Sequence, residues 1–189
     1  MDKKVLIVFY SRTGNTAALA DEIRQSLELS GAQSDIARLQ ERLERRRGLI
    51  GFIRSGFEAR LGHSTELKPL EHDPSHYDLV VIGTPVWAGS VSVPVRTFLE
   101  ENRGRLKEVA FFLSHGGTAH RRTFRQMAEL CMREPVGRLR VRDRELSRGT
   151  HRAELRAFAE RLAEVVARPP PAGIRPKARL SGFAPATSH

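Results

Sequence analysis

Short apolar runs alternate along the chain with longer stretches in which apolar residues recur every three or four positions. Runs of the first kind predict β-strands, and periodic stretches of the second kind predict helices that bury one face. The pattern predicts five strands, at residues 5–10, 33–39, 77–83, 109–113 and 136–141. Helical periodicity follows each strand, so strand and helix are expected to alternate through most of the chain.

This alternation predicts the α/β class, with a doubly wound, five-stranded parallel sheet, right-handed crossovers and helices on both faces. Residues 79–82 are uninterrupted apolar residues, which is typical of a central strand buried on both faces. Residues 33–39 alternate only weakly and predict an edge strand. One domain is expected at residues 1–167, followed by a disordered, proline-rich tail at residues 168–189.

The turn after the first strand carries hydroxyl side chains and a glycine at the start of a helix. Its residues are Ser11, Arg12, Thr13, Gly14, Asn15 and Thr16. Unpartnered backbone N–H groups and the positive end of the helix dipole favour phosphate binding at such a turn. The Gly-Lys-Ser/Thr of nucleoside-triphosphate loops and the G-x-G-x-x-G of dinucleotide loops are both missing. An ordinary glycine turn with a hydroxyl helix cap is the alternative interpretation.

Two further loops follow predicted strands and contain groups suited to a flat ligand. One consists of Thr84, Pro85, Val86, Trp87, Ala88 and Gly89, and the other begins with Ser114, His115, Gly116 and Gly117. The single tryptophan of the chain lies in the first of these loops, where its indole can stack on a heteroaromatic ring. The paired glycines permit a close approach of the backbone. Because loops after parallel strands meet at one edge of a sheet, the three loops are expected to form one site.

The three loops resemble those of the flavodoxin family over about residues 3–167. The T/S-x-T-G-x-T pattern of the first loop and the Thr-Pro-x-Trp-x-Gly pattern of the second are the more specific. The resemblance implies the sheet order 2-1-3-4-5 and FMN bound without covalent attachment by the residues of the three loops. It also implies that the flavin carries the redox chemistry, so no catalytic side chain is expected. His115 is a candidate modulator of the flavin, and a solvent-facing histidine is the alternative.

The chain is strongly basic, with 32 lysines and arginines against 22 acidic residues and a net charge of +10. Such a balance suits nucleic acid or an anionic membrane. The arginines are spread over several segments, however, and only two tyrosines and one tryptophan are available for base stacking, so no specific nucleic acid is expected. Flavodoxins are typically acidic. The reversed charge here predicts an acidic partner and a raised second reduction potential for the flavin.

A basic amphipathic segment occupies residues 40–61. Its arginines include Arg45, Arg46, Arg47, Arg54 and Arg60. The segment is interpreted as the crossover helix between the second and third strands, packed on the sheet through its apolar side. Peripheral contact with a membrane, or docking of a partner, is the alternative.

Few residues offer competing chemistry. Cys131, the single cysteine, falls on the apolar face of a predicted helix and is expected in the core. His63, His72 and His76 lack metal-site spacing and are expected to be solvated, so no metal is expected. No apolar run approaches the roughly 20 residues that span a bilayer, and the first residues lead directly into a strand rather than a signal peptide. A cytoplasmic protein is therefore expected.

Three functions remain open from the sequence. The first is an FMN-binding redox protein that carries electrons between protein partners. The second is an FMN-dependent reductase of a small acceptor, of the quinone or protoporphyrinogen type. The third is a basic module that binds nucleic acid or an anionic surface without flavin. The predicted partner is accordingly a redox protein or a small-molecule acceptor.

Overall fold

A parallel sheet forms the centre of the molecule. The computed structural model describes residues 4–42, 65–117 and 120–168, and all statements of structure concern these ranges. Its parallel strands are β1 (Val5–Phe9), β2 (Ser34–Arg38), β3 (Leu79–Trp87), β5 (Glu108–His115) and β6 (Arg138–Arg142). They pair in the order β2-β1-β3-β5-β6, which is the expected order 2-1-3-4-5 when the parallel strands alone are counted. The predicted α/β fold class is confirmed.

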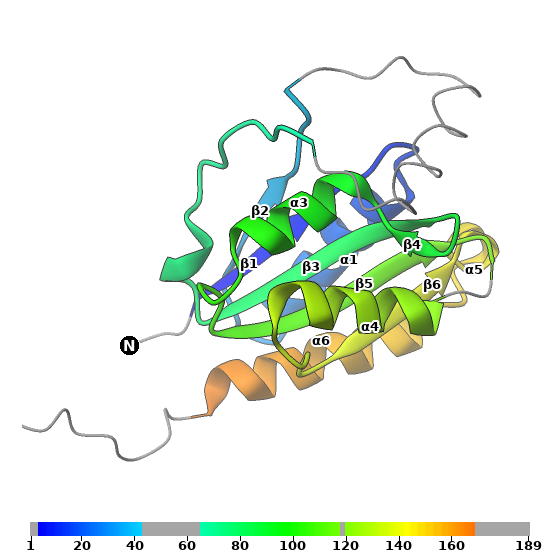
Figure 1. The fold of residues 1–189 in the computed structure, drawn as a ribbon. Coiled ribbons are helices and arrows are strands. Elements are labelled where there is room, and N and C mark those ends of the chain that lie inside the picture. The colour runs from blue at the N-terminus through cyan, green and yellow to red at the C-terminus, as the bar shows by residue number, and fades with distance from the viewer. Residues whose placement is uncertain (1–3, 43–64, 118–119, 169–189) are drawn as a thin grey trace, which may run out of the picture.

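Helices cover both faces of this sheet (Figure 1). On one face, α1 (Asn15–Leu29) packs beside α6 (Arg152–Ala167). On the other face, α3 (Val93–Glu101) packs beside α4 (His120–Cys131). The apolar stripes predicted from the sequence are the buried faces of these helices, as Leu19, Ile23 and Leu27 illustrate on α1.

Each face of the sheet has its own hydrophobic cluster, and β5 contributes to both. Val109, Phe111 and Leu113 belong to the cluster beneath α3 and α4, whereas Ala110 and Phe112 belong to the cluster beneath α1 and α6. This assignment follows from the two-residue period of a strand. Burial on both faces explains why residues 109–113 of β5 are apolar without interruption.

Cys131 lies fully buried in the cluster beneath α3 and α4, which confirms the prediction that it is a core residue. Burial raises the pKa of its thiol.

Of the histidines that were expected to be solvated, His72 and His76 lie in the described residues. His76 is exposed, but the Nδ1 atom of half-buried His72 lies 2.9 Å from the Tyr77 hydroxyl, so His72 is tied to the protein rather than simply solvated.

Gly83 allows β3 and β5 to pack closely in the centre of the sheet. It pairs in register with Phe112, whose ring covers the space that a side chain at position 83 would need. A Cβ atom on Gly83 would lie 2.0 Å from Cζ of Phe112. Real Cβ atoms do not approach other heavy atoms so closely, so glycine is required at this position.

Three elements differ from their sequence-based expectation. Trp87 was expected in a loop, yet it is the last residue of β3, because a short strand β4 (Ser90–Val91) turns back and pairs with the end of β3. Ala88 and Gly89 form the turn with positive φ angles of 47° and 75°. A helix α5 (Asp143–Arg148), which the sequence pattern did not predict, also follows β6 directly.

Several predictions fall outside the described residues. These predictions concern most of the basic segment at 40–61, His63, and the tail at 169–189. Within the described ranges, α6 ends at Ala167, close to the predicted end of the domain. None of the helices in these ranges is long and apolar enough to cross a membrane.

We expect Gly83→Ala to lower the free energy of unfolding by about 2 kcal/mol or more, because the added methyl group overlaps the Phe112 ring and forces the core to shift. Urea denaturation followed by circular dichroism measures this change. Gly117→Ala is the control, since its Cβ atom would meet nothing within 4 Å. Replacing the Phe112 ring by a smaller side chain, in the double variant Gly83→Ala/Phe112→Leu, should recover part of the lost free energy of unfolding. Equal stability of Gly83→Ala and Gly117→Ala would contradict the close packing described here.

Candidate functional site

The register of the sheet brings the carboxyl ends of three strands together. Phe9 of β1 pairs with Gly83 of β3, and Pro85 of β3 pairs with Ser114 of β5. The loops that follow these strands therefore emerge side by side at one edge of the sheet. This edge, where the strand order reverses between β1 and β3, is where open α/β sheets bind ligands.

The first loop is held open at the start of α1. Gly14 adopts a left-handed conformation with φ of 98°, and its N–H donates to the Ser11 Oγ atom at 3.2 Å. From β2, Arg38 donates to the Ser11 carbonyl oxygen at 2.6 Å. No side chain in the described residues caps α1. The first-turn N–H groups and the helix dipole are thus directed at the loop, which is the arrangement that binds a phosphate group.

A buried hydrogen bond links the first loop to the third. The hydroxyl groups of Thr16 and Ser114 lie 2.8 Å apart, and both residues are almost fully buried. The start of α1 is thereby fixed to the end of β5. Of the hydroxyl groups in the first loop, that of Thr16 is thus in contact with Ser114.

The second loop begins with residues that are occupied within the protein. Thr84 is fully buried, its Oγ1 lies 2.8 Å from the Ser92 Oγ atom, and it accepts from the Ser92 N–H at 3.1 Å. Ser92 immediately precedes α3. The side chain of Thr84 therefore fixes β3 to the start of α3. Pro85 and Val86 are half-buried and continue the strand toward Trp87.

Trp87 lies where the first and second loops meet. Its ring packs edge-to-face against Tyr10, with the centroids 5.6 Å apart and the planes at 88°. The Arg12 guanidinium lies 5.9 Å from the indole centroid, in position for a cation–π contact. Trp87 is only 7% exposed. A planar ligand that stacks on the face covered by Arg12 would have to displace that guanidinium.

Tyr10 supports this arrangement from the end of β1. Its hydroxyl donates to the Glu41 Oε2 atom at 3.4 Å. Burial, together with the nearby Glu41 carboxylate, raises the pKa of Tyr10 to about 12. The phenol therefore stays neutral and keeps its proton for Glu41 across the physiological pH range.

His115 ends β5 and is 2% exposed, so the alternative that it faces solvent is wrong. Its Nδ1 lies 2.5 Å from the Gly117 carbonyl oxygen, which assigns the proton of the neutral ring to Nδ1. The buried Nε2 atom has no partner among the described residues. Burial lowers the pKa of His115, and the charges of Arg140 and Arg142 lower it further. The imidazole is therefore neutral near pH 7 and orients the third loop through Gly117.

The glycine loop after β5 borders a cavity of about 370 Å³. Gly116, Gly117, Arg142, Asp143 and Arg144 line it. Asp143, the first residue of α5, accepts a hydrogen bond from the Asn15 Nδ2 atom at 2.8 Å. This contact brings α5 to the first loop as well.

The three predicted loops are thus neighbours, and the structure adds Tyr10, Arg38 and Asp143 to them. Tyr10 ends an apolar run and Arg38 ends a strand, so position along the sheet could have suggested both. Nothing in the local sequence marked Asp143, because its proximity depends on the helix α5. An uncapped helix start, an indole and a glycine pair fit the phosphate, ring and ring edge of a flavin mononucleotide.

Comparison with known proteins agrees with this fit. A family model described as NADPH-dependent FMN reductase matches residues 4–133. An NAD(P)H dehydrogenase (quinone) of Cupriavidus metallidurans is 27% identical over 101 residues, which are 53% of this chain and 47% of that protein. A protein of the same name from Rhodopseudomonas palustris is 28% identical over the same shares. The chain thus matches about half the length of these curated relatives.

Solved structures also resemble the chain. A flavoprotein from Lactobacillus acidophilus, crystallised in complex with FMN, superposes with a TM-score of 0.64 at 25% identity, covering 78% of this chain and 99% of that one. A flavodoxin from the domain Archaea superposes with a TM-score of 0.54 at 19% identity, covering 87% and 99%. The second likeness concerns the fold alone.

The lowered pKa of His115 predicts a specific dependence of stability on pH. The folded protein binds the imidazole proton less readily than the unfolded chain. The free energy of unfolding therefore has its full value above pH 6.5 and decreases as the pH falls below 6.5. The loss of stability between pH 7.5 and 5.5 should be smaller in His115→Asn than in the unmodified protein. Thermal unfolding at both pH values measures the difference. His76→Asn, at an exposed position, is the control, and an identical pH slope in all three proteins would contradict this burial effect.

Proposed function

Since the chain belongs to the NADPH-dependent FMN reductase family and is an FMN-binding flavoprotein with a flavodoxin-like fold, we propose that it is an FMN-dependent oxidoreductase. In this proposal it oxidises NAD(P)H and reduces a small acceptor of the quinone type. The observation that carries the proposal is the meeting of three loops at the carboxyl edge of β1, β3 and β5, fixed by the Thr16–Ser114 hydrogen bond.

In this function, the first loop holds the phosphate of FMN through the backbone N–H groups that follow Gly14 at the start of α1. Trp87 and the turn after it border the ring, and Gly116 with Gly117 approaches its polar edge. When bound, FMN supplies the redox chemistry, taking up hydride and releasing electrons to an acceptor. The protein residues bind and orient, because no described side chain supplies an acid–base pair at this edge.

Neutral His115 and the two nearby arginines set the charge beneath the third loop. The buried imidazole carries no charge near pH 7, whereas Arg140 and Arg142 are positive and close enough to lower its pKa. Positive charge at this side of the site favours ligands that gain negative charge. His115 therefore acts as a positioning residue for the Gly117 carbonyl rather than as a proton donor to substrate.

The quinone acceptor is supported by the names of the curated relatives, which are NAD(P)H dehydrogenases (quinone). A second candidate function is electron transfer to an acidic protein partner, and the observation that favours it is the net charge of +10. Peripheral attachment to an anionic membrane through residues 45–60 is compatible with either function. A flavin-free nucleic-acid module is not carried further, because the chain belongs to a flavoprotein family.

Turnover distinguishes the two candidates. Purified protein reconstituted with FMN should oxidise NADPH steadily when a water-soluble quinone is added, with no other protein present. This is measured by the loss of NADPH absorbance. Bound FMN that is reduced only in the presence of a separate reductase would instead support the electron carrier.

Gly14→Ala should weaken FMN binding by roughly tenfold. A left-handed conformation costs a residue with a Cβ atom about 1–2 kcal/mol, so the phosphate loop is expected to rearrange. Titration of Trp87 fluorescence with FMN measures the dissociation constant.

Gly104→Ala is a matched control, because Gly104 also has a positive φ of 78° and open space around its Cα but lies between α3 and β5, away from the loops. Both variants should lose similar amounts of folding stability, and only Gly14→Ala should lose FMN affinity. Equal FMN affinity in the two variants would place the phosphate elsewhere.

A further inference from the structure

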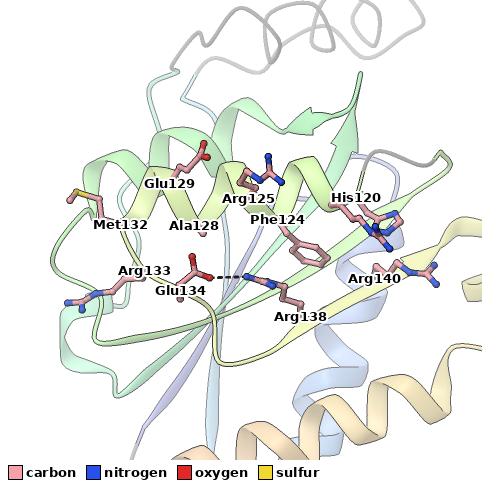
Figure 2. Close-up of a pocket in the computed structure, with 11 residues that line it drawn as sticks. His120, Phe124, Arg125, Ala128, Glu129, Met132, Arg133, Glu134, Arg138 and Arg140 are labelled. Atoms are coloured by element: carbon pink, nitrogen blue, oxygen red, sulfur yellow. Dashed lines mark hydrogen bonds and ion pairs between the residues drawn. The ribbon is translucent and has the colours of Figure 1, made fainter.

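A groove runs between α4 and β6, on the face of the sheet opposite α1 and α6 (Figure 2). Its volume is about 790 Å³. Five arginines line it: Arg121, Arg125, Arg133, Arg138 and Arg140. Two glutamates, Glu129 and Glu134, are the acidic residues of its lining. The groove is therefore concave and has an excess of positive charge.

The alternation of β6 places two of these arginines in the groove. Leu139 and Val141 are buried in the cluster beneath α1 and α6, so Arg138 and Arg140 point to the α4 side. Because β6 ends the order of the sheet, no further strand lies beside it in the described residues. The helix α4 forms the opposite wall and contributes Arg121 and Arg125 one turn apart.

In three of the five arginines, no contact with the described residues competes with a ligand for the guanidinium group. Arg138 forms an ion pair with Glu134 at 3.0 Å, and Arg133 donates from Nε to the Leu106 carbonyl oxygen at 3.1 Å. The guanidinium groups of Arg121, Arg125 and Arg140 make no hydrogen bond or ion pair among the described residues. Unpaired arginines that face one another across a groove repel, and an anion between them removes that repulsion.

Unsatisfied polar atoms gather at the end of the groove nearest the third loop. The Arg140 Nη1 atom and the His120 Nδ1 atom are both buried without a hydrogen-bond partner in the described part of the chain. The ring of His120 lies 5.4 Å from that of His115, whose Nε2 is also unpartnered. Leaving such groups buried and unpaired is costly. The Glu145 carboxylate is the nearby acidic group, but it accepts from the Arg142 N–H and forms no ion pair with Arg140.

The middle of the groove is apolar. Phe124 and Ala128 lie at its floor, and the side chain of Met132, which is 69% exposed, lies at its far end (Figure 2). A site with an apolar floor and a few polar groups at one end is typical of small organic ligands, and the volume of the groove falls in their usual range.

We propose that the groove between α4 and β6 binds a small organic molecule through a phosphate group held by Arg140, His120 and Arg125. A phosphate has three terminal oxygens that reach donors on two walls at once, whereas a planar carboxylate engages one wall. Two sources of this group are distinguishable. One is the 2′-phosphate of NADPH, which rests on the proposed function because this end of the groove adjoins the third loop. The other is an unrelated phosphorylated metabolite.

The test uses the FMN-saturated protein, so that the phosphate loop at α1 is already filled. Adenosine 2′,5′-bisphosphate and inorganic phosphate are titrated in a calorimeter. The double variant Arg125→Gln/Arg140→Gln removes two donors, and the single variant Arg125→Gln changes only an exposed side chain. Arg156→Gln removes the same charge from the exposed side of α6, across the sheet. Imidazole NMR signals of His115 and His120 report whether binding occurs at this end.

The unmodified protein is expected to bind at least one probe with a dissociation constant below about 1 mM. The double variant should weaken binding more than tenfold, because it removes two charged donors from the phosphate. Arg125→Gln should weaken it several-fold, and Arg156→Gln should stay within twofold. Binding should shift the His120 signal.

The probes separate the two sources. Bisphosphate binding at least tenfold tighter than phosphate binding assigns the site to NADPH, and equal binding assigns it to another phosphorylated compound. The proposal is overturned if neither probe binds. It is also overturned if Arg156→Gln weakens binding as much as Arg125→Gln does, or if only an acidic peptide or a nucleic acid binds. If the protein takes up no FMN, the proposed function fails. The groove is then tested by the same titration without FMN, in which Arg125→Gln should still bind the probes more weakly than the unmodified protein.

Discussion

Parallel pairing of the strands is the constraint on which the rest of the structure depends. Parallel strands need a long crossover between them, and that crossover lies on one face of the sheet as a helix. Every loop that leaves the carboxyl end of a strand therefore arrives at the same edge. Gly83 permits the close approach of β3 to the Phe112 side chain of β5, and Thr16 bonds to Ser114 across the edge. Sheet packing and loop placement are consequences of the same geometry.

The pattern of apolar residues was sufficient to predict the fold class, because buried parallel strands have uninterrupted apolar sequences. The buried strands β1, β3 and β5 were recognisable in this way, and the strand order followed from a family resemblance. The environment of single side chains was not accessible in the same way. Trp87 was expected in a loop because small residues follow it, but those residues form a tight turn that extends β3 and buries the indole against Tyr10. The alternative that His115 faces solvent was wrong for the same reason, since the burial of a strand end depends on its neighbours.

Other features of the site arise from contacts between distant segments, which no local pattern encodes. Asn15 and Asp143 are separated by 128 positions in the sequence and meet only because α5 follows β6 at the same edge. The arginines were counted as a diffuse basic surface, yet the two-residue period of β6 and the one-turn spacing on α4 direct several of them into one groove. Composition gave the sign of the charge, and the fold determined where that charge is concentrated.

The alternating sequence of β6 also affects how the protein behaves at high concentration. An edge strand presents backbone donors and acceptors that can pair with a strand of another molecule, and proteins protect such edges with charged side chains. Arg138, Arg140 and Arg142 place a cation at every second position of this strand. Two copies approaching edge to edge would bring these rows of like charge together, which disfavours strand pairing. The side chains that make the groove attractive to an anion therefore also oppose self-association into extended sheets.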